Sequence, residues 1–196
     1  GCTNNEVVDI PQSRAINFSN AFVNNTTRAD VTNADFKQFW VYGDYQNDAL
    51  WVDVFNNVKV SGASVGSSAT WTPEETAYWQ VNKTYNFGAY ADGTSQLTTG
   101  ILYEPASKTL TFSDYSAGAN DLIAATSSDV SWDGSVDPAK VQLSFKHMLS
   151  KVKFTFKTDA VETYTMKVSG LKISQAIQTA TGTMVNNVVG TWSGDK

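Results

Sequence analysis

The sequence predicts an all-β protein built as a β-sandwich, on three observations. Short runs of β-favouring residues recur along the 196 residues, and clusters of Asn, Asp, Gly, Ser and Thr separate them. Apolar and polar residues alternate within the runs, as they do in strands with one buried face. Hydrophobic residues make up 41% of the chain, enough for one buried core, yet no run approaches the roughly 18 apolar residues of a membrane helix.

The strands are expected in the order in which the alternating runs occur. Residues 1–14 predict a flexible leader and residues 24–35 an exposed polar loop. The segment Asp121–Ala125 is too short to be assigned as a helix. The expected strands are 15–23, 36–42, 50–55, 59–62, 69–71, 85–90, 101–103, 109–112, 141–157 and 164–173, followed by a hairpin over 181–192.

The segment 141–157 has a change of phase that must be explained. Its first apolar trio is Val141, Leu143 and Phe145, and the second trio, at 152, 154 and 156, has the opposite parity. An uninterrupted strand would send the two trios to opposite faces of its sheet. We therefore predict a bulge or tight bend near 148–150 that returns the second trio to the same core.

Charge and cysteine content exclude several classes of site. The formal net charge is −5 and the 14 basic residues are spread along the chain, so no basic stripe for nucleic acid is present. Cys2 is the single cysteine, which excludes an intramolecular disulfide and a multi-thiolate metal site. Gly1-Cys2 matches the end of a bacterial lipobox, and we expect Cys2 to carry lipid; the alternative is an ordinary terminal thiol.

Catalytic chemistry finds little support in the residues. The one histidine, His147, is expected to bond a backbone group at a bend, because no nucleophile motif accompanies it. Glu74 and Glu75 fit a solvated turn, and the acids at 44, 48 and 53 lack a calcium-loop pattern. We predict no enzyme, no metal and no cofactor. A carboxylate-dependent hydrolase, the alternative, would need two acids that converge in a cleft.

The six tryptophans raise a second alternative, a surface glycan-binding lipoprotein of the β-sandwich type. Such a protein would present coplanar exposed indoles on one face. Trp40 and Trp51 lie in strand-like runs and are expected to fill or cover a core. Trp79 and Trp132 lie in turn-rich context and are expected to be more exposed.

The order of short motifs resembles that of the fimbrillin family of Bacteroidetes, the subunits of surface fimbriae. The most specific region is F-x-H-x-L-S-K-V-x-F at 145–154. The other motifs that carry the resemblance are I-x-F at 16–18, Thr27-Arg28, F-x-V-x-G at 39–43, V-F-N-N at 54–57, the pair Trp71 and Trp79, F-x-A-Y at 87–90, and D-L-I at 121–123.

This resemblance implies a fold and a domain organisation. Fimbrillin subunits usually have two β-sandwich domains with Greek-key, transthyretin-like topology. Here it implies a lipoprotein leader and removable first strand over 1–28, and one β-sandwich over 29–196 that corresponds to the N-terminal domain, with the C-terminal domain absent.

The resemblance also implies how the protein works. A trypsin-like protease would cut after Arg28, remove the strand that carries Ile16, Phe18 and Phe22, and leave a groove for a strand of another subunit. The implied partners are fimbrial subunits, in a homo- or hetero-polymer, with host or bacterial surface glycans or proteins as further candidates. The implied location is the cell surface, in a fimbrium or as an outer membrane lipoprotein held by its lipid alone.

Overall fold

A computed structural model describes residues 14–23, 36–63, 69–150, 154–159, 165–172 and 178–194, with the backbone alone at 20–23. Within these ranges the protein is all β, and its strands form two sheets. The strands are β1 (Phe18–Val23), β2 (Gln38–Asn47), β3 (Leu50–Ser61), β4 (Thr72–Pro73), β5 (Tyr85–Asp92), β6 (Ile101–Glu104), β7 (Thr109–Tyr115), β8 (Leu122–Val130), β9 (Val141–His147), β10 (Ala180–Val185) and β11 (Val188–Val189).

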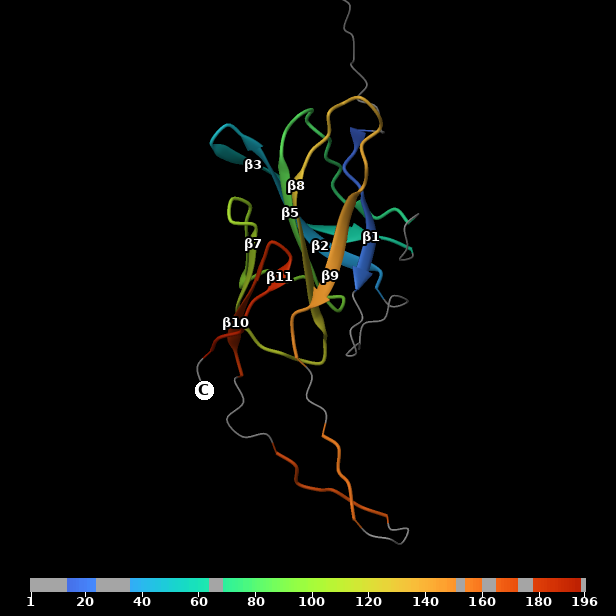
Figure 1. Ribbon diagram of the computed structural model, residues 1–196, viewed down its shortest axis with the longest axis vertical. Helices are drawn as coiled ribbons and strands as arrows, with labels where there is room; N and C mark the ends of the chain where they lie inside the picture. The colour runs from blue at the N-terminus through green and yellow to red at the C-terminus, as the bar shows by residue number, and fades with distance from the viewer. Residues whose placement is uncertain are drawn as a thin grey trace, which may run out of the picture.

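The larger sheet has seven strands in the order β1-β9-β8-β5-β2-β3-β4, and the smaller one has four in the order β11-β10-β7-β6. β1 runs parallel to β9, whereas every other described pair of neighbouring strands is antiparallel. Figure 1 shows β1 beside β9 at one side of the molecule, with β7, β10 and β11 at the other. The predicted sandwich is confirmed, and its Greek-key, transthyretin-like topology stays a prediction.

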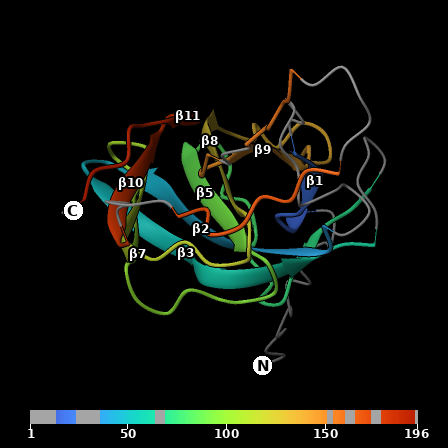
Figure 2. The same ribbon diagram turned by 90° about the horizontal axis from the view of Figure 1, so that it is seen from below.

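The seven-stranded sheet curls until its two edges meet. Figure 2 shows its strands along an arc from β3 through β5 and β8 to β9 and β1. Phe18 in β1 forms an antiparallel bridge with Trp71, the residue that precedes β4 at the other edge. The larger sheet is therefore closed, and β1 is the strand that closes it.

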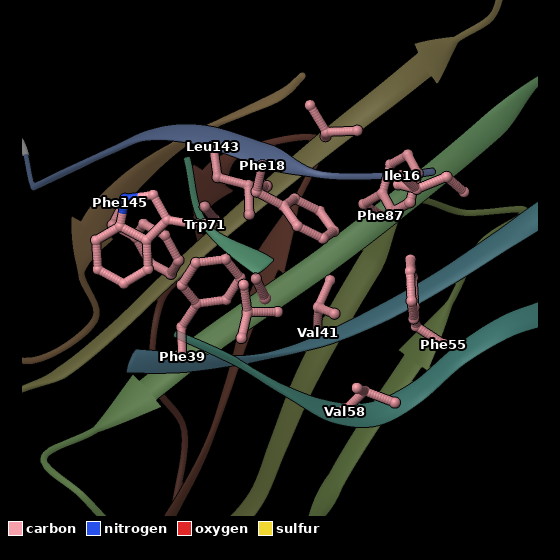
Figure 3. Packing of buried hydrophobic residues seen from close by; sticks show 14 of the residues in the cluster. Ile16, Phe18, Phe39, Val41, Phe55, Val58, Trp71, Phe87, Leu143 and Phe145 are labelled. Carbon is pink, nitrogen blue, oxygen red and sulfur yellow. The ribbon is translucent and has the colours of Figure 1, made fainter. Parts of the chain in front are cut away.

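Two hydrophobic clusters fill the molecule, one on each side of the larger sheet. The first lies inside the curl and is rich in aromatic residues from β1, β2, β3, β5 and β9 (Figure 3). The second lies between the two sheets and joins Trp40 and Tyr90 of the larger sheet to Phe112 and Met184 of the smaller one. The central strand β5 is buried along its whole length because it contributes to both clusters.

A bulge in β3 allows this strand to send residues of opposite parity to the same core. Val41 pairs with Val58 and Gly43 pairs with Phe55, so two residues of β3 lie opposite one residue of β2. Asn57, in the bulge, has a φ of 56°, a conformation that asparagine tolerates better than most residues. Phe55 and Val58 are consequently both buried in the first cluster.

Several predicted strands are confirmed, including those of β2, β5, β6, β7 and β9 and the final hairpin. The hairpin turns at Asn186 and Asn187, which both have positive φ, as a two-residue β-turn of the primed type requires. The separate runs 50–55 and 59–62 form one strand, β3. No element was predicted for Asp121–Ala125. In the structure β8 begins at Leu122, inside this segment.

The prediction for 141–157 is half right. Val141, Leu143 and Phe145 are buried in the first cluster as expected. The second trio does not return to that core: Phe154 and Phe156 are 48% and 47% exposed, and residue 152 lies outside the described residues. The chain leaves the sandwich after β9, and residues 154–159 and 165–172 extend beyond its lower end in Figure 1 without strand structure. The strand predicted over 164–173 is therefore wrong for 165–172.

The described part of the chain contains no helix that is long and apolar enough to cross a membrane.

Candidate functional site

The strand predicted to be removable occupies a slot with two walls. On one side, the Val141 amide of β9 donates to the Asn17 carbonyl, at 2.8 Å. On the other side, Phe18 and Trp71 exchange two backbone hydrogen bonds, of 3.0 and 2.8 Å, and the Ile16 amide donates to the Ala77 carbonyl at 2.8 Å. Backbone pairing on both sides is the situation of a strand in the middle of a sheet.

The side chains of this segment fill the interior of the curl. Ile16 is 1% exposed and Phe18 is fully buried. The ring of Phe18 packs edge-on against Phe39 and Phe87, with centroids 5.7 and 5.8 Å away, and tilted against Phe55 at 6.0 Å. Figure 3 shows Phe18 pointing from β1 into this group of rings. The first strand is therefore part of the core.

The remaining residues of the processing hypothesis are described only in part. The backbone of Phe22 lies in β1 and pairs with Ser144 of β9, but its side chain lies outside the description. Arg28 and Cys2 also lie outside the described residues. The other arginine, Arg14, lies at the entry to β1: its carbonyl accepts a hydrogen bond from the Trp79 amide, and its guanidinium lies 5.5 Å from the centre of the Trp132 ring.

His147 has a different partner from the backbone group that we expected. Its Nδ1 lies 2.6 Å from Oδ2 of Asp121, and the side chains are 12% and 11% exposed. The reason is that β9 ends at His147 directly beside the start of β8, where Asp121 precedes Leu122. The other ring nitrogen, Nε2, is buried and makes no hydrogen bond within the described part of the chain, so no nucleophile is held against it.

Two cavities contain carboxylates in their walls, as a hydrolase would need. One, of about 720 Å³, lies beside His147 and has Asp121 as the one carboxylate among its lining residues. The other, of about 480 Å³, is lined by Glu74 and Glu75, and Glu74 forms an ion pair of 3.3 Å with Lys59. Both glutamates are exposed in a bend, in agreement with the predicted solvated turn. Neither arrangement sets two opposed carboxylates across a cleft.

Two aspartates lie opposite each other on neighbouring strands. Asp44 of β2 pairs in register with Asp53 of β3. Burial, and to a smaller degree the charge of Asp53, raises the pKa of Asp44 to about 6. Burial also raises the pKa of Asp53. Among the residues that the structure describes, no three acidic, histidine or cysteine side chains gather closely enough to hold a metal ion.

The tryptophans expected to be exposed are buried. Trp79 is 4% exposed because it packs edge-on against Tyr85, with ring centroids 4.6 Å apart. Trp132 is 8% exposed, and its indole donates a hydrogen bond to the Val136 carbonyl. Turn-rich sequence around them suggested exposure, but both indoles are part of the first cluster. These two indoles therefore offer no stacking platform for a sugar.

Comparison with known proteins identifies the family. A family model described as fimbrillin-like matches residues 27–196, which is most of the chain. The chain belongs to the fimbrillin-like family. No curated protein and no solved structure matches it. A fimbrillin-like protein is a structural subunit, is located in fimbriae at the cell surface, and assembles with other fimbrial subunits.

Sequence reasoning missed one half of the site of this fimbrillin-like protein. It singled out Ile16 and Phe18 but gave no partner for them. The wall formed by Trp71 and Ala77 could not be found from periodicity, because residues 71–79 contain only the two-residue strand β4. The available signal was the alternation of Ile16 and Phe18, which marks a strand without naming its neighbours.

Proposed function

We propose that this fimbrillin-like protein is a building block of fimbriae and assembles by donor-strand complementation. In this mechanism a protease cuts after Arg28, the segment that contains β1 leaves, and a strand of another subunit takes its place between β9 and the Trp71 wall. The observation that carries the proposal is the position of Phe18: its backbone is paired on one side, its neighbour Asn17 is paired on the other, and its ring is buried.

The energetics of β1 support exchange rather than simple loss. Burying Ile16 and Phe18 contributes about 1.5 to 3 kcal/mol each, or roughly 3 to 6 kcal/mol together. This is comparable to the 5 to 15 kcal/mol by which a whole domain is typically stable. A chain that loses β1 and gains nothing would therefore be close to unfolding, and a chain that captures another strand would recover both the core and the backbone hydrogen bonds.

The two arginines allow a clean test of processing. Arg14 and Arg28 are the only arginines in the sequence, so an arginine-specific protease acting on an Arg14→Lys variant can cut after Arg28 alone. The cleaved chain should form oligomers in size-exclusion chromatography with light scattering. A double variant, Arg14→Lys with Arg28→Lys, should resist the protease and stay monomeric. The proposal fails if the cleaved chain stays monomeric and melts within a few degrees of the intact one.

Attachment to the outer membrane through Cys2 is a second part of the proposal. It is supported by the Gly1-Cys2 pair, which matches the end of a bacterial lipobox and contains the single cysteine of the sequence. One acyl chain binds a membrane only marginally, so the several chains of a bacterial lipoprotein would be needed for stable anchoring. Labelling of the native host with a clickable fatty acid tests it: Cys2→Ser should abolish the label, and equal labelling of both proteins would rule lipidation out.

A further inference from the structure

We infer that the groove vacated by β1 selects its new strand through one aromatic anchor: the incoming strand of another subunit carries a phenylalanine at the position of Phe18, two residues after a branched aliphatic side chain at the position of Ile16. This inference rests on the proposed function. It adds the chemistry of the partner strand, which neither the family nor the donor-strand mechanism specifies.

Phe18 is fully buried, and the pocket that holds its ring includes three phenylalanine rings. Phe39 comes from β2, Phe55 from β3 and Phe87 from β5, so three neighbouring strands each contribute one ring. Two of the three contacts are edge-on, the geometry in which aromatic pairs gain energy beyond their buried area. An aliphatic side chain in this pocket would lose both of these contacts.

The dimensions of the pocket depend on a glycine. Gly43 lies in β2, and a Cβ atom at this position would come within 2.7 Å of the Phe87 ring and 3.1 Å of the Phe55 ring. Because glycine has no Cβ atom, the rings of Phe55 and Phe87 can occupy the positions in which they contact Phe18. Position 43 therefore sets how large an anchor the groove accepts.

The outward-facing positions of the segment place much weaker demands on the partner. Asn17 and Ser19 alternate with the buried residues and are only partly buried. Asn17 accepts the hydrogen bond from β9 with its backbone carbonyl, which any residue supplies. The pattern required of the partner strand is thus branched aliphatic, any residue, phenylalanine.

Tyrosine should be rejected in spite of its similar shape. Phe18 has no exposed surface, so a hydroxyl on its ring would be buried among the three phenylalanine rings. Burying a hydroxyl that has no hydrogen-bond partner destabilises the complex. A hydrophobic groove without a defined shape would instead bind phenylalanine and tyrosine nearly equally. Discrimination between these two residues therefore separates a shaped anchor pocket from general hydrophobic capture.

Peptide competition tests the inference. The chain cleaved after Arg28 is unfolded in denaturant and refolded with a fluorescent peptide of residues 14–23 and increasing amounts of an unlabelled competitor. Relative to the native sequence, a Phe18→Ala competitor should be about 100-fold weaker or more, and Phe18→Leu and Phe18→Tyr each about 10-fold weaker. The control peptide Asn17→Ala should compete within about 2-fold of the native one.

Variants of the groove show whether the pocket itself sets this preference. Gly43→Ala should bring the capture of phenylalanine and leucine peptides toward equality, because the displaced rings leave less room. Phe55→Leu widens the pocket and should raise the relative capture of a Phe18→Trp peptide. These ratios compare two peptides on one protein, so a general loss of stability does not produce them.

The outcomes are distinct. Capture of Phe18→Tyr or Phe18→Ala as efficiently as the native peptide would overturn the inference, as would failure to capture any peptide. If the peptides are captured with the expected preference but the cleaved chain forms no oligomers, the anchor pocket stands and the fimbrial assembly proposed above is wrong.

Discussion

Phe18 and Trp71 exchange two backbone hydrogen bonds, of 3.0 and 2.8 Å, across the seam where the seven-stranded sheet closes on itself. Fifty-two residues of sequence separate them, so the bond pair is a long-range closure and not a local turn. On its other side the same segment lies parallel to β9. The first core thus depends on β1 for its stability. Apart from its covalent connection to the rest of the chain, β1 is held in place by noncovalent contacts alone.

The first prediction contrasts a buried phenylalanine with an exposed one. Phe18→Ala should reduce the free energy of unfolding by about 3 to 5 kcal/mol, because the ring is fully buried among three others. Phe154→Ala should reduce it by less than about 1 kcal/mol, because Phe154 is 48% exposed. Urea unfolding of both variants measures the difference. Similar losses would mean that residues 154–159 pack into a core that the structure does not show.

The second prediction concerns the packing of the two sheets. A Cβ atom at Gly88 in β5 would lie 2.6 Å from the ring of Tyr103 in β6. Gly88→Ala should therefore lower stability by about 1 to 3 kcal/mol, the usual cost of overpacking. Gly118→Ala is the control, because no atom lies within 4 Å of a Cβ placed there. Thermal melting compares them, and an unchanged melting temperature for Gly88→Ala would contradict the packing of the smaller sheet on β5.

The third prediction is a pH dependence that arises from Asp44. Its pKa is about 6 in the folded chain, against an ordinary value of 3.8, so the folded protein binds this proton more tightly than the unfolded chain does. Binding of this proton therefore stabilises the folded protein. The stabilisation is complete below about pH 4 and is lost as the pH rises through about 6.

Asparagine does not ionise, so an Asp44→Asn variant does not lose stability as the pH rises. The variant should be more stable than the wild type at pH 7 and as stable as the wild type at pH 3.5. We expect a gain of about 1 kcal/mol, since the carboxyl group is only partly buried and solvent screens its charge. Chemical unfolding across this pH range measures it. The exposed turn variant Asp48→Asn is the control, and equal gains from both variants would mean that the effect is one of net charge.

The fourth prediction addresses the side-chain contact between His147 and Asp121. A double-mutant cycle of His147→Ala and Asp121→Ala should give a coupling energy of about 1 to 3 kcal/mol, because each single variant leaves a largely buried polar partner unpaired. Oligomer formation after cleavage should not change in any variant that folds. Loss of assembly in a stably folded His147→Ala protein would assign the residue a role that its contacts do not suggest.

Alternation of apolar and polar residues predicts a strand well where only one face of that strand is buried. It correctly placed β9 and the burial of Val141, Leu143 and Phe145, because a strand with one buried face carries its orientation in its own residues. It failed at Asp121–Ala125: Leu122, Ile123, Ala124 and Ala125 are buried on both faces of the sheet, and a continuous apolar run has no period to read.

The register correction shows a different limit. We predicted one at 148–150 from a change of parity. Met148 and Leu149 instead pack in the second cluster, and Phe154 and Phe156 beyond them are about half exposed. A correction of this kind does occur in β3, where the bulge at Asn57 lets Phe55 and Val58 reach the same core. Both sites have the same pattern of parity. A segment with this pattern returns to the core only where a neighbouring strand pairs with it, as β2 does with β3. The sequence of one segment does not show whether such a neighbour is present.

The central claim is that β1 must leave its slot before the protein can assemble. Ser19 of β1 and Gln142 of β9 are partners in the parallel ladder, so cysteines at these two positions, in a Cys2→Ser background, should form a disulfide that locks β1 in place. The measurement is light scattering of this variant after cleavage at Arg28, with and without reductant. The account predicts monomers when the disulfide is intact and polymers once it is reduced. Polymers of equal size in both states, or monomers in both, would contradict it.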